Sequence, residues 1–227
     1  RSWGQGAQHS QALHSYFMHI PGIKVVAPST PHDAKGCLIA AIRDNNPVVF
    51  MEHRMLYGNA GIVPEEPFAT TLGHARTLTA GDDVTIVAVS HIVVEALRAK
   101  HLLEQADIEA EVIDPVTLAP LDMDTITASV ERTGRVLVVD NSWTMCGTSA
   151  EIVAQLAERL QGKREFRVAR LGYAPVPCPT TKPLENLFYP NAKTIAQSAY
   201  ALVKQNGAGW DPTVPEASEI AEFKGPF

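Results

Sequence analysis

Hydrophobic positions at the start of the chain alternate between helical and strand patterns. The spacing of apolar residues predicts a helix over 8–19, a strand over 23–27, a helix over 33–43 and a strand over 47–51. Pro21 and Gly22 are expected to end the first helix. A strand, a helix and a second strand within about 30 residues are typical of a βαβ unit, so this block predicts a parallel sheet.

A second block with the same alternation begins at Val84. Its apolar runs predict strands over 84–89, 111–113, 136–139 and 166–169, and helices over 91–105, 122–134, 148–160 and 195–204. Residues 53–82 follow neither period, and Pro64 and Pro67 favour an extended crossing between the blocks. The expected fold class is α/β, with two mostly parallel sheets and helices on both faces of each. The first sheet has only two expected strands, which is few for independent stability.

Local signals mark the ends of two helices. Thr30 precedes Pro31, and Asp33 follows three residues after Thr30, which is the pattern of an N-cap. Asp122 or Asp124 is expected to cap the helix that ends at Gly134.

Composition supports a folded domain and excludes several classes of protein. Of the 227 residues, 45% are hydrophobic and 19% are charged, which excludes a disordered or collagenous chain. The net charge of −6 makes the chain a poor candidate for non-specific nucleic-acid binding. No apolar run reaches the length of a membrane span. Cys37, Cys146 and Cys178 show no metal or redox spacing, so we expect reduced thiols and a cytoplasmic protein.

The densest polar cluster lies near the beginning, over 4–11, in the order Gly-Gln-Gly-Ala-Gln-His-Ser-Gln. It stands where a glycine-rich loop enters the first predicted helix, and backbone amides at a helix N-terminus favour anions. His9 can relay a proton near neutral pH from such a position, which makes it the catalytic candidate. The alternative is that His9 is one of several surface histidines.

A second cluster lies where the helix over 33–43 must end. The last carbonyls of a helix carry the negative end of its dipole, and Asp44 and Asn46 add side-chain oxygens beside Ala41 and Ile42. Such oxygens predict a site for a hard monovalent cation. The alternative is an ordinary helix end solvated by water. No G-x-G-x-x-G, P-loop or G-x-S-x-G motif accompanies these clusters.

The ordered succession of motifs resembles the beta subunit of the thiamine-diphosphate-dependent 2-oxoacid dehydrogenases, the decarboxylating components of the pyruvate and branched-chain complexes. The likeness extends over about residues 1–205. It is carried by the segments 4–11, 19–26, 28–36, 41–49, 52–57, 121–126, 136–140 and 150–152, and by the proline-rich stretch before Leu184.

The resemblance implies a domain organisation. Residues 1–62 would be the C-terminal half of a pyrimidine-binding domain, 63–82 a linker, 83–205 a transketolase C-terminal domain and 206–227 an irregular tail. The N-terminal half of the pyrimidine-binding domain would lie upstream, together with the glutamate and the aromatic residue that contact the cofactor's pyrimidine. This chain therefore offers no cofactor-binding residue of its own by this comparison.

The resemblance also implies roles and partners. His9 would face the cofactor and assist acyl transfer to lipoamide, and Ala41, Ile42, Asp44 and Asn46 would bind potassium. An alpha subunit would hold the diphosphate of thiamine diphosphate and its magnesium. A second beta subunit and a lipoyl acyltransferase would complete the assembly, so the chain alone is expected to be inactive. The sequence departs from the family's pattern after Asp140, where Asn141-Ser142-Trp143 follows instead of an acidic residue and a glycine-rich turn.

Two other interpretations stay open from the sequence. One is a fragment of the transketolase or deoxyxylulose-phosphate synthase type, since those enzymes share the same succession of elements. The other is a non-catalytic assembly module.

Overall fold

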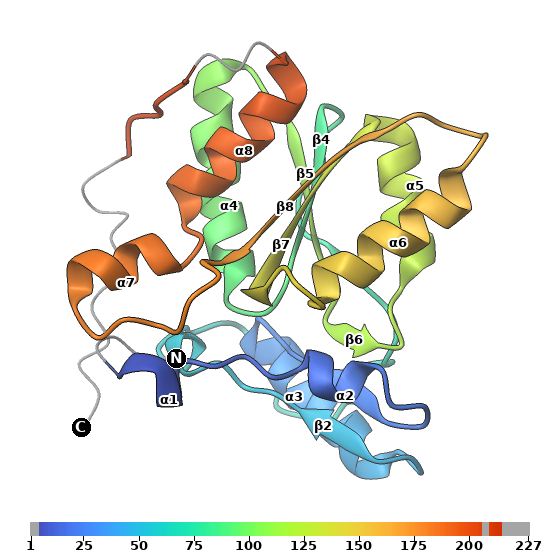
Figure 1. Ribbon diagram of the computed structural model, residues 1–227. Coiled ribbons are helices and arrows are strands. Elements are labelled where there is room, and N and C mark those ends of the chain that lie inside the picture. The colour runs from blue at the N-terminus through green and yellow to red at the C-terminus, as the bar shows by residue number, and fades with distance from the viewer. Residues whose placement is uncertain (1–4, 206–208, 215–227) are drawn as a thin grey trace.

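The computed structural model describes residues 5–205 and 209–214, which form two sheets (Figure 1). The larger sheet has five strands in the order β3-β5-β4-β7-β8. Its strands are β3 (Arg76–Thr77), β4 (Val84–Ala88), β5 (Ala110–Asp114), β7 (Arg135–Trp143) and β8 (Arg167–Tyr173). All neighbouring strands are parallel except β3, which is antiparallel to β5. This confirms the mostly parallel sheet predicted for the second block.

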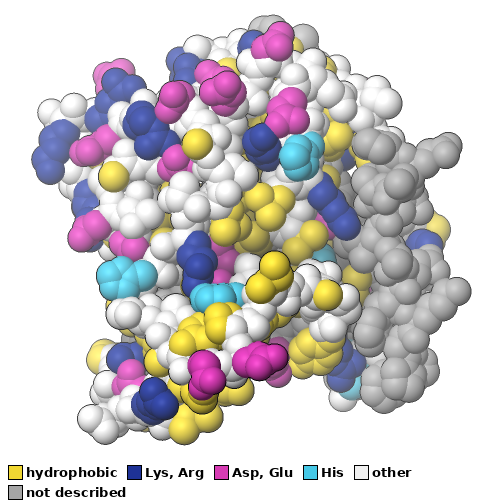
Figure 2. All heavy atoms as spheres, turned by 180° about the vertical axis from the view of Figure 1, so that it is seen from behind, with side chains coloured by type: hydrophobic (Ala, Val, Ile, Leu, Met, Phe, Trp, Pro, Cys, Tyr) yellow, Lys and Arg dark blue, Asp and Glu magenta, His cyan; other side chains and the backbone are white. Residues whose placement is uncertain are grey.

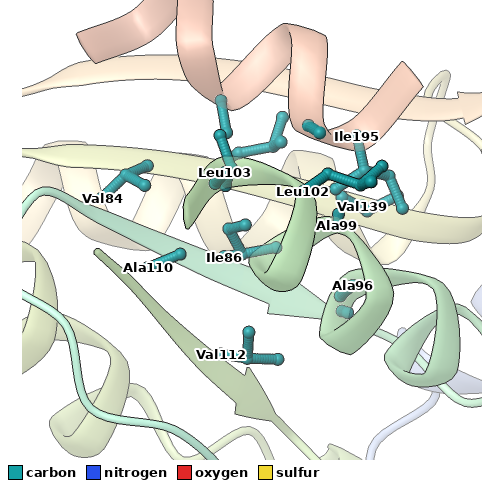
Figure 3. Close-up of a cluster of buried hydrophobic side chains, with 14 of the residues drawn as sticks. Val84, Ile86, Ala96, Ala99, Leu102, Leu103, Ala110, Val112, Val139 and Ile195 are labelled. Atoms are coloured by element: carbon teal, nitrogen blue, oxygen red, sulfur yellow. The ribbon is translucent and has the colours of Figure 1, made fainter. Parts of the chain in front are cut away.

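Helices cover both faces of the larger sheet (Figure 1). They are α4 (Ile92–Leu103) and α8 (Ala192–Lys204) on one face, and α5 (Met123–Thr133) and α6 (Thr148–Leu160) on the other. Successive side chains of β4 point to opposite faces, so Ile86 joins the cluster under α4 and α8, and Val87 joins the one under α5 and α6. Figure 3 shows Ile86 beside Leu103 and Val112 in the first cluster.

The smaller sheet contains strands from both blocks of the sequence. Its order is β2-β1-β6, with β1 (Lys24–Val26), β2 (Val48–Phe50) and β6 (Thr117–Ala119). Helix α3 (Pro31–Arg43) connects β1 to β2, which are parallel, as the βαβ pattern predicted. The sequence analysis missed β6, which follows β5 and pairs antiparallel with β1. Because β6 lies within the second block, it ties the two sheets together.

The helix predicted over 8–19 is wrong as a single element. The structure has two short helices, α1 (Gly6–His9) and α2 (Ser15–Met18), separated by residues 10–14. The helical spacing of the apolar side chains is interrupted because Ser10 and His14 are buried against the rest of the molecule. Tertiary contacts therefore override the local pattern.

The predicted helix caps are confirmed. The Thr30 side chain accepts a hydrogen bond from the backbone N–H of Asp33. Asp122 caps α5, and Gly134 ends it in a left-handed conformation. The sequence analysis missed α7 (Lys182–Phe188) and two short 3-10 helices, η1 (Arg54–Leu56) and η2 (Glu104–Ala106). Residues 209–214 form no helix or strand, although Trp210 stacks on Tyr200 of α8.

The face seen in Figure 2 is divided by chemistry. Basic and acidic side chains are interspersed over its upper part, whereas hydrophobic side chains gather over its lower part, on the side of the smaller sheet. The exposed large hydrophobic residues of the first block include Leu38 and Ile42 of α3, and Tyr57 and Ile62 after it. Among the described residues, no helix has the length and apolar character needed to cross a membrane.

Candidate functional site

The segment with the catalytic candidate, residues 5–19, precedes the smaller sheet and contacts the larger one through His14 and Asp140. His9 is the last residue of α1 and its side chain is exposed. The prediction placed His9 where a loop enters a helix, but the structure puts it at the C-terminal end of a four-residue helix. The amides of that helix therefore do not form an anion site around the imidazole. His9 is available to a molecule that approaches from outside this chain.

Gly6 fixes the start of this segment against the second block. Its φ of +67° lies in the left-handed region, and a Cβ at this position would come within 2.7 Å of Cγ2 of Thr180. Both features favour glycine. Gln5 provides a second contact, because its side-chain oxygen accepts a hydrogen bond of 3.3 Å from Arg54.

His14 fixes the other end of the segment. Its Nε2 lies 3.1 Å from Oδ1 of Asp140, which is 126 positions away in the chain, and both residues are buried. A carboxylate oxygen only accepts hydrogen bonds, so Nε2 carries the proton. Nothing local in the sequence distinguishes His14 from the other histidines, so the pattern alone does not predict this pair.

Asp140 is the centre of a buried polar junction. Besides His14, its carboxylate accepts hydrogen bonds from Oγ of Ser142 at 3.0 Å and from the backbone N–H of Ser149 at 2.9 Å. The Ser149 amide belongs to the first turn of α6, where a negative charge is favourable. The junction therefore joins the carboxyl end of β7, the N-terminus of α6 and the histidine segment.

A small polar cavity of about 90 Å³ lies next to this junction. Its polar lining residues include Gln11, His14, Ser90, Asn141 and Tyr173. Asn141 accepts a hydrogen bond of 3.0 Å from the Tyr173 hydroxyl. The cavity lies at the carboxyl edge of the larger sheet, where sites of parallel α/β proteins are found, because Ser90 follows β4 and Asn141 lies in β7.

A second buried junction connects the two sheets through Asp114, the last residue of β5. Its carboxyl group accepts hydrogen bonds from the Ser29 hydroxyl and from the backbone N–H of Val116. Burial raises the pKa of Asp114 to about 7, in spite of these donors, and the nearby Asp33 adds to the rise. Val116 has a φ of +56°, which is strained for a β-branched residue. The sequence analysis did not identify this junction.

The predicted cation cluster at the end of α3 is brought together only in part. Asp44 accepts hydrogen bonds from the ammonium of Lys24 and from both the backbone and side-chain nitrogens of Asn46, at 2.9 and 3.0 Å. The hydrogen bond from Lys24 is the main cause that lowers the pKa of Asp44 to about 2. The Ala41 carbonyl accepts from the Asp44 amide at 3.3 Å, and Ile42 is exposed. Lys24 therefore already supplies a cation to the Asp44 carboxylate.

Thiamine diphosphate does not fit the described residues by themselves. An open groove of about 760 Å³ borders α2 and α6. Its lining includes His19 and Glu151, but no lysine or arginine of the described residues. A diphosphate needs cationic partners or free helix amides. In the first turn of α6, which borders the groove, the amide of Ser149 is already bonded to Asp140. Most of the contacts for such a cofactor must therefore come from outside this part of the chain.

Comparisons with known proteins agree with the two blocks. Residues 4–59 match the family described as transketolase, pyrimidine binding domain, and residues 73–195 match transketolase, C-terminal domain. The chain is 46% identical over 198 residues to the acetoin:2,6-dichlorophenolindophenol oxidoreductase subunit beta of Cupriavidus necator. It is 43% identical over 180 residues to the pyruvate dehydrogenase E1 component subunit beta of Porphyra purpurea. These matches include 87% and 79% of this chain, but only 59% and 54% of the relatives.

A solved structure supports the fold. The chain superposes on a split gene transketolase, described as an inactive beta4 tetramer, with a TM-score of 0.72 and 22% identity, over 89% of this chain and 64% of the other. At this identity the likeness shows the fold alone. The match over residues 73–195, more than half of the chain, shows that the chain belongs to the transketolase C-terminal domain family.

Proposed function

We propose that this chain is the part of a beta subunit that presents His9 to the substrate in the oxidative decarboxylation of a 2-oxo acid, pyruvate or a branched-chain acid, with acyl transfer to lipoamide. The observation that carries the proposal is the exposed His9. Its segment matches the pyrimidine-binding domain and is bonded to the second block through the buried pair of His14 and Asp140. An exposed imidazole on a held segment can orient an acyl acceptor and move a proton at its ring nitrogens.

The proposal assigns the cofactor to the assembled enzyme. Thiamine diphosphate and its magnesium would be held mainly by an alpha subunit, since no lysine or arginine of the described residues lines the groove beside α2. The exposed apolar side chains Leu38 and Ile42 support contact with further subunits, which would be the alpha subunit, a second beta subunit and the lipoyl acyltransferase. A cytoplasmic location and the division at residues 62, 82 and 205 belong to the same proposal.

Potassium at Ala41, Ile42, Asp44 and Asn46 remains part of the proposal. The carbonyl oxygens at the end of α3 support it. Lys24 competes for the Asp44 carboxylate, so we expect the backbone carbonyls to contribute more than that side chain.

Acetoin is a second candidate substrate. The relative with 46% identity is named for acetoin oxidation, and the pyruvate dehydrogenase relative has 43% identity. Acetoin and 2-oxo acids both place a carbonyl carbon next to the bond that breaks, so the same histidine can serve either substrate.

An assay of the complete enzyme tests the proposed function. The complete beta chain is combined with its alpha subunit, thiamine diphosphate and magnesium, and is offered pyruvate, a branched-chain 2-oxo acid, acetoin and a ketose phosphate. We expect turnover of a 2-oxo acid or acetoin, and none by the 227-residue chain alone. Turnover of the ketose phosphate only would favour the transketolase type. No turnover of any substrate would favour an assembly module.

A further inference from the structure

The segment over 5–19 has little structure of its own. Helices α1 and α2 have four residues each, and neither has a side-chain hydrogen bond at its N-cap. Isolated helices shorter than about 12–15 residues are marginal in water, so the backbone around His9 depends on tertiary contacts.

The contacts at the two ends of this segment reach the same block. Near the beginning, Gly6 packs against Thr180 in the stretch before α7. At residue 14, the imidazole donates its hydrogen bond to Asp140 in the central part of the larger sheet, where β7 lies between β4 and β8. His9 therefore lies between two points that are fixed by the transketolase C-terminal domain, although its own segment matches the pyrimidine-binding domain.

The hydrogen bond between His14 and Asp140 is buried, and its acceptor is held in place by other donors. Side chains are 4% exposed for His14 and 0% for Asp140, so both partners are shielded from bulk solvent. The Asp140 carboxylate is also held by Ser142 and Ser149, which fix its direction. Removing one partner of a buried charged hydrogen bond costs more than the bond itself contributes, because the other partner stays buried.

We propose that His14 is a positioning residue for His9: its hydrogen bond to Asp140 holds the α1 segment on the carboxyl edge of the larger sheet and so sets the place of the His9 imidazole. The idea rests on the proposed function for its catalytic consequence. The C-terminal domain then contributes to catalysis by holding a histidine of the other domain.

The Ser29–Asp114 hydrogen bond offers a matched control. It is also buried, also joins the two blocks, and lies at the carboxyl end of β5. Neither of its residues belongs to the segment with His9. Ser29→Ala therefore weakens a contact between the two blocks without touching the segment that contains His9.

Hydrogen exchange of the 227-residue chain tests the tether without any activity. His14→Leu keeps the bulk and removes the donor, whereas His14→Gln places an N–H at nearly the reach of Nε2. We expect amides over 5–19 to exchange about tenfold faster in His14→Leu, and close to the wild-type rate in His14→Gln and in Ser29→Ala. Unchanged exchange over 5–19 in His14→Leu, or equal acceleration in Ser29→Ala, overturns the proposal. If His14→Leu does not fold, His14→Asn, whose amide is too short to reach Asp140, replaces it with the same expected outcome.

Half-reactions of the complete enzyme test the positioning role. We expect His14→Leu to lower acyl transfer to lipoamide at least about tenfold more than decarboxylation with an artificial electron acceptor, and His14→Gln to restore the wild-type ratio. In a His9→Ala background, His14→Leu should change the ratio no further, because both act through one imidazole. Equal losses in both half-reactions, as in Ser29→Ala, overturn the positioning role. A wild-type enzyme without turnover contradicts the proposed function instead, and leaves the exchange result to decide the tether.

Discussion

At the scale of single residues, the two buried carboxyl groups Asp140 and Asp114 have different hydrogen-bond partners. Asp140 is paired with the His14 imidazole and with a helix amide, whereas the Asp114 carboxyl group accepts hydrogen bonds from a hydroxyl and one backbone N–H and lies near Arg76. The neighbouring Asp33 further disfavours a charge on Asp114. A carboxyl group in this setting takes up a proton near neutral pH, so Asp114 makes the stability of the chain depend on pH.

The direction of this dependence follows from the pKa of Asp114, which rises from 3.8 to about 7 on folding. The folded chain binds more protons than the unfolded chain between these values. The contribution of Asp114 to the free energy of unfolding is therefore full below about pH 4 and is lost as the pH rises through about 7. We expect Asp114→Asn to lose less stability than the wild type between pH 5 and pH 8, as measured by urea unfolding. The control is Asp107→Asn, which removes an exposed charge at a left-handed position that asparagine tolerates. Parallel pH profiles of wild type and Asp114→Asn would contradict the assignment.

At the scale of elements, the N-cap of α3 contributes to the free energy of unfolding. The Thr30 hydroxyl accepts from the Asp33 amide at 3.1 Å and donates to the Asp33 carboxylate at 2.8 Å. Thr30→Ala should lower the free energy of unfolding by about 1 kcal/mol, measured in urea. Thr181→Ala is the matched control, since Thr181 is the N-cap of α7 but makes no side-chain capping bond. A cost at Thr30 no larger than that at Thr181 would show that the cap contributes nothing.

Elements whose cause is local were predictable from the sequence, and elements whose cause is distant were not. The cap at Thr30, the stop at Gly134 and the buried strand from Val84 follow from neighbouring residues, and the structure confirms them. Between α1 and α2, His14 is bonded to Asp140, a contact 126 positions away that no local pattern reveals. The three-residue strand β6 forms because it pairs with the edge of β1, and this pairing partner is distant in the sequence. The candidate site divides in the same way: the sequence predicts roles for His9 and for the end of α3, which stay predictions, but it does not reveal Lys24 as the partner of Asp44.

At the scale of the whole molecule, the two blocks are joined by β6 and by two buried polar junctions. His14 with Asp140 lies at the end of β7, and Ser29 with Asp114 lies at the end of β5. Both junctions therefore gather at the carboxyl edge of the larger sheet, where sites of parallel α/β proteins are found. The His14–Asp140 junction therefore concerns the His9 segment, and the Ser29–Asp114 junction concerns the pH dependence of stability.

The proposed role of His9 in acyl transfer is tested by His9→Ala in the complete enzyme, with both half-reactions measured. General acid–base groups contribute about 10²–10⁴-fold, so acyl transfer to lipoamide should fall well over tenfold more than decarboxylation with an artificial electron acceptor. Thermal stability should change little, because the exposed imidazole has few packing contacts to lose. Small and equal losses in both half-reactions would contradict the account and make His9 an ordinary surface histidine.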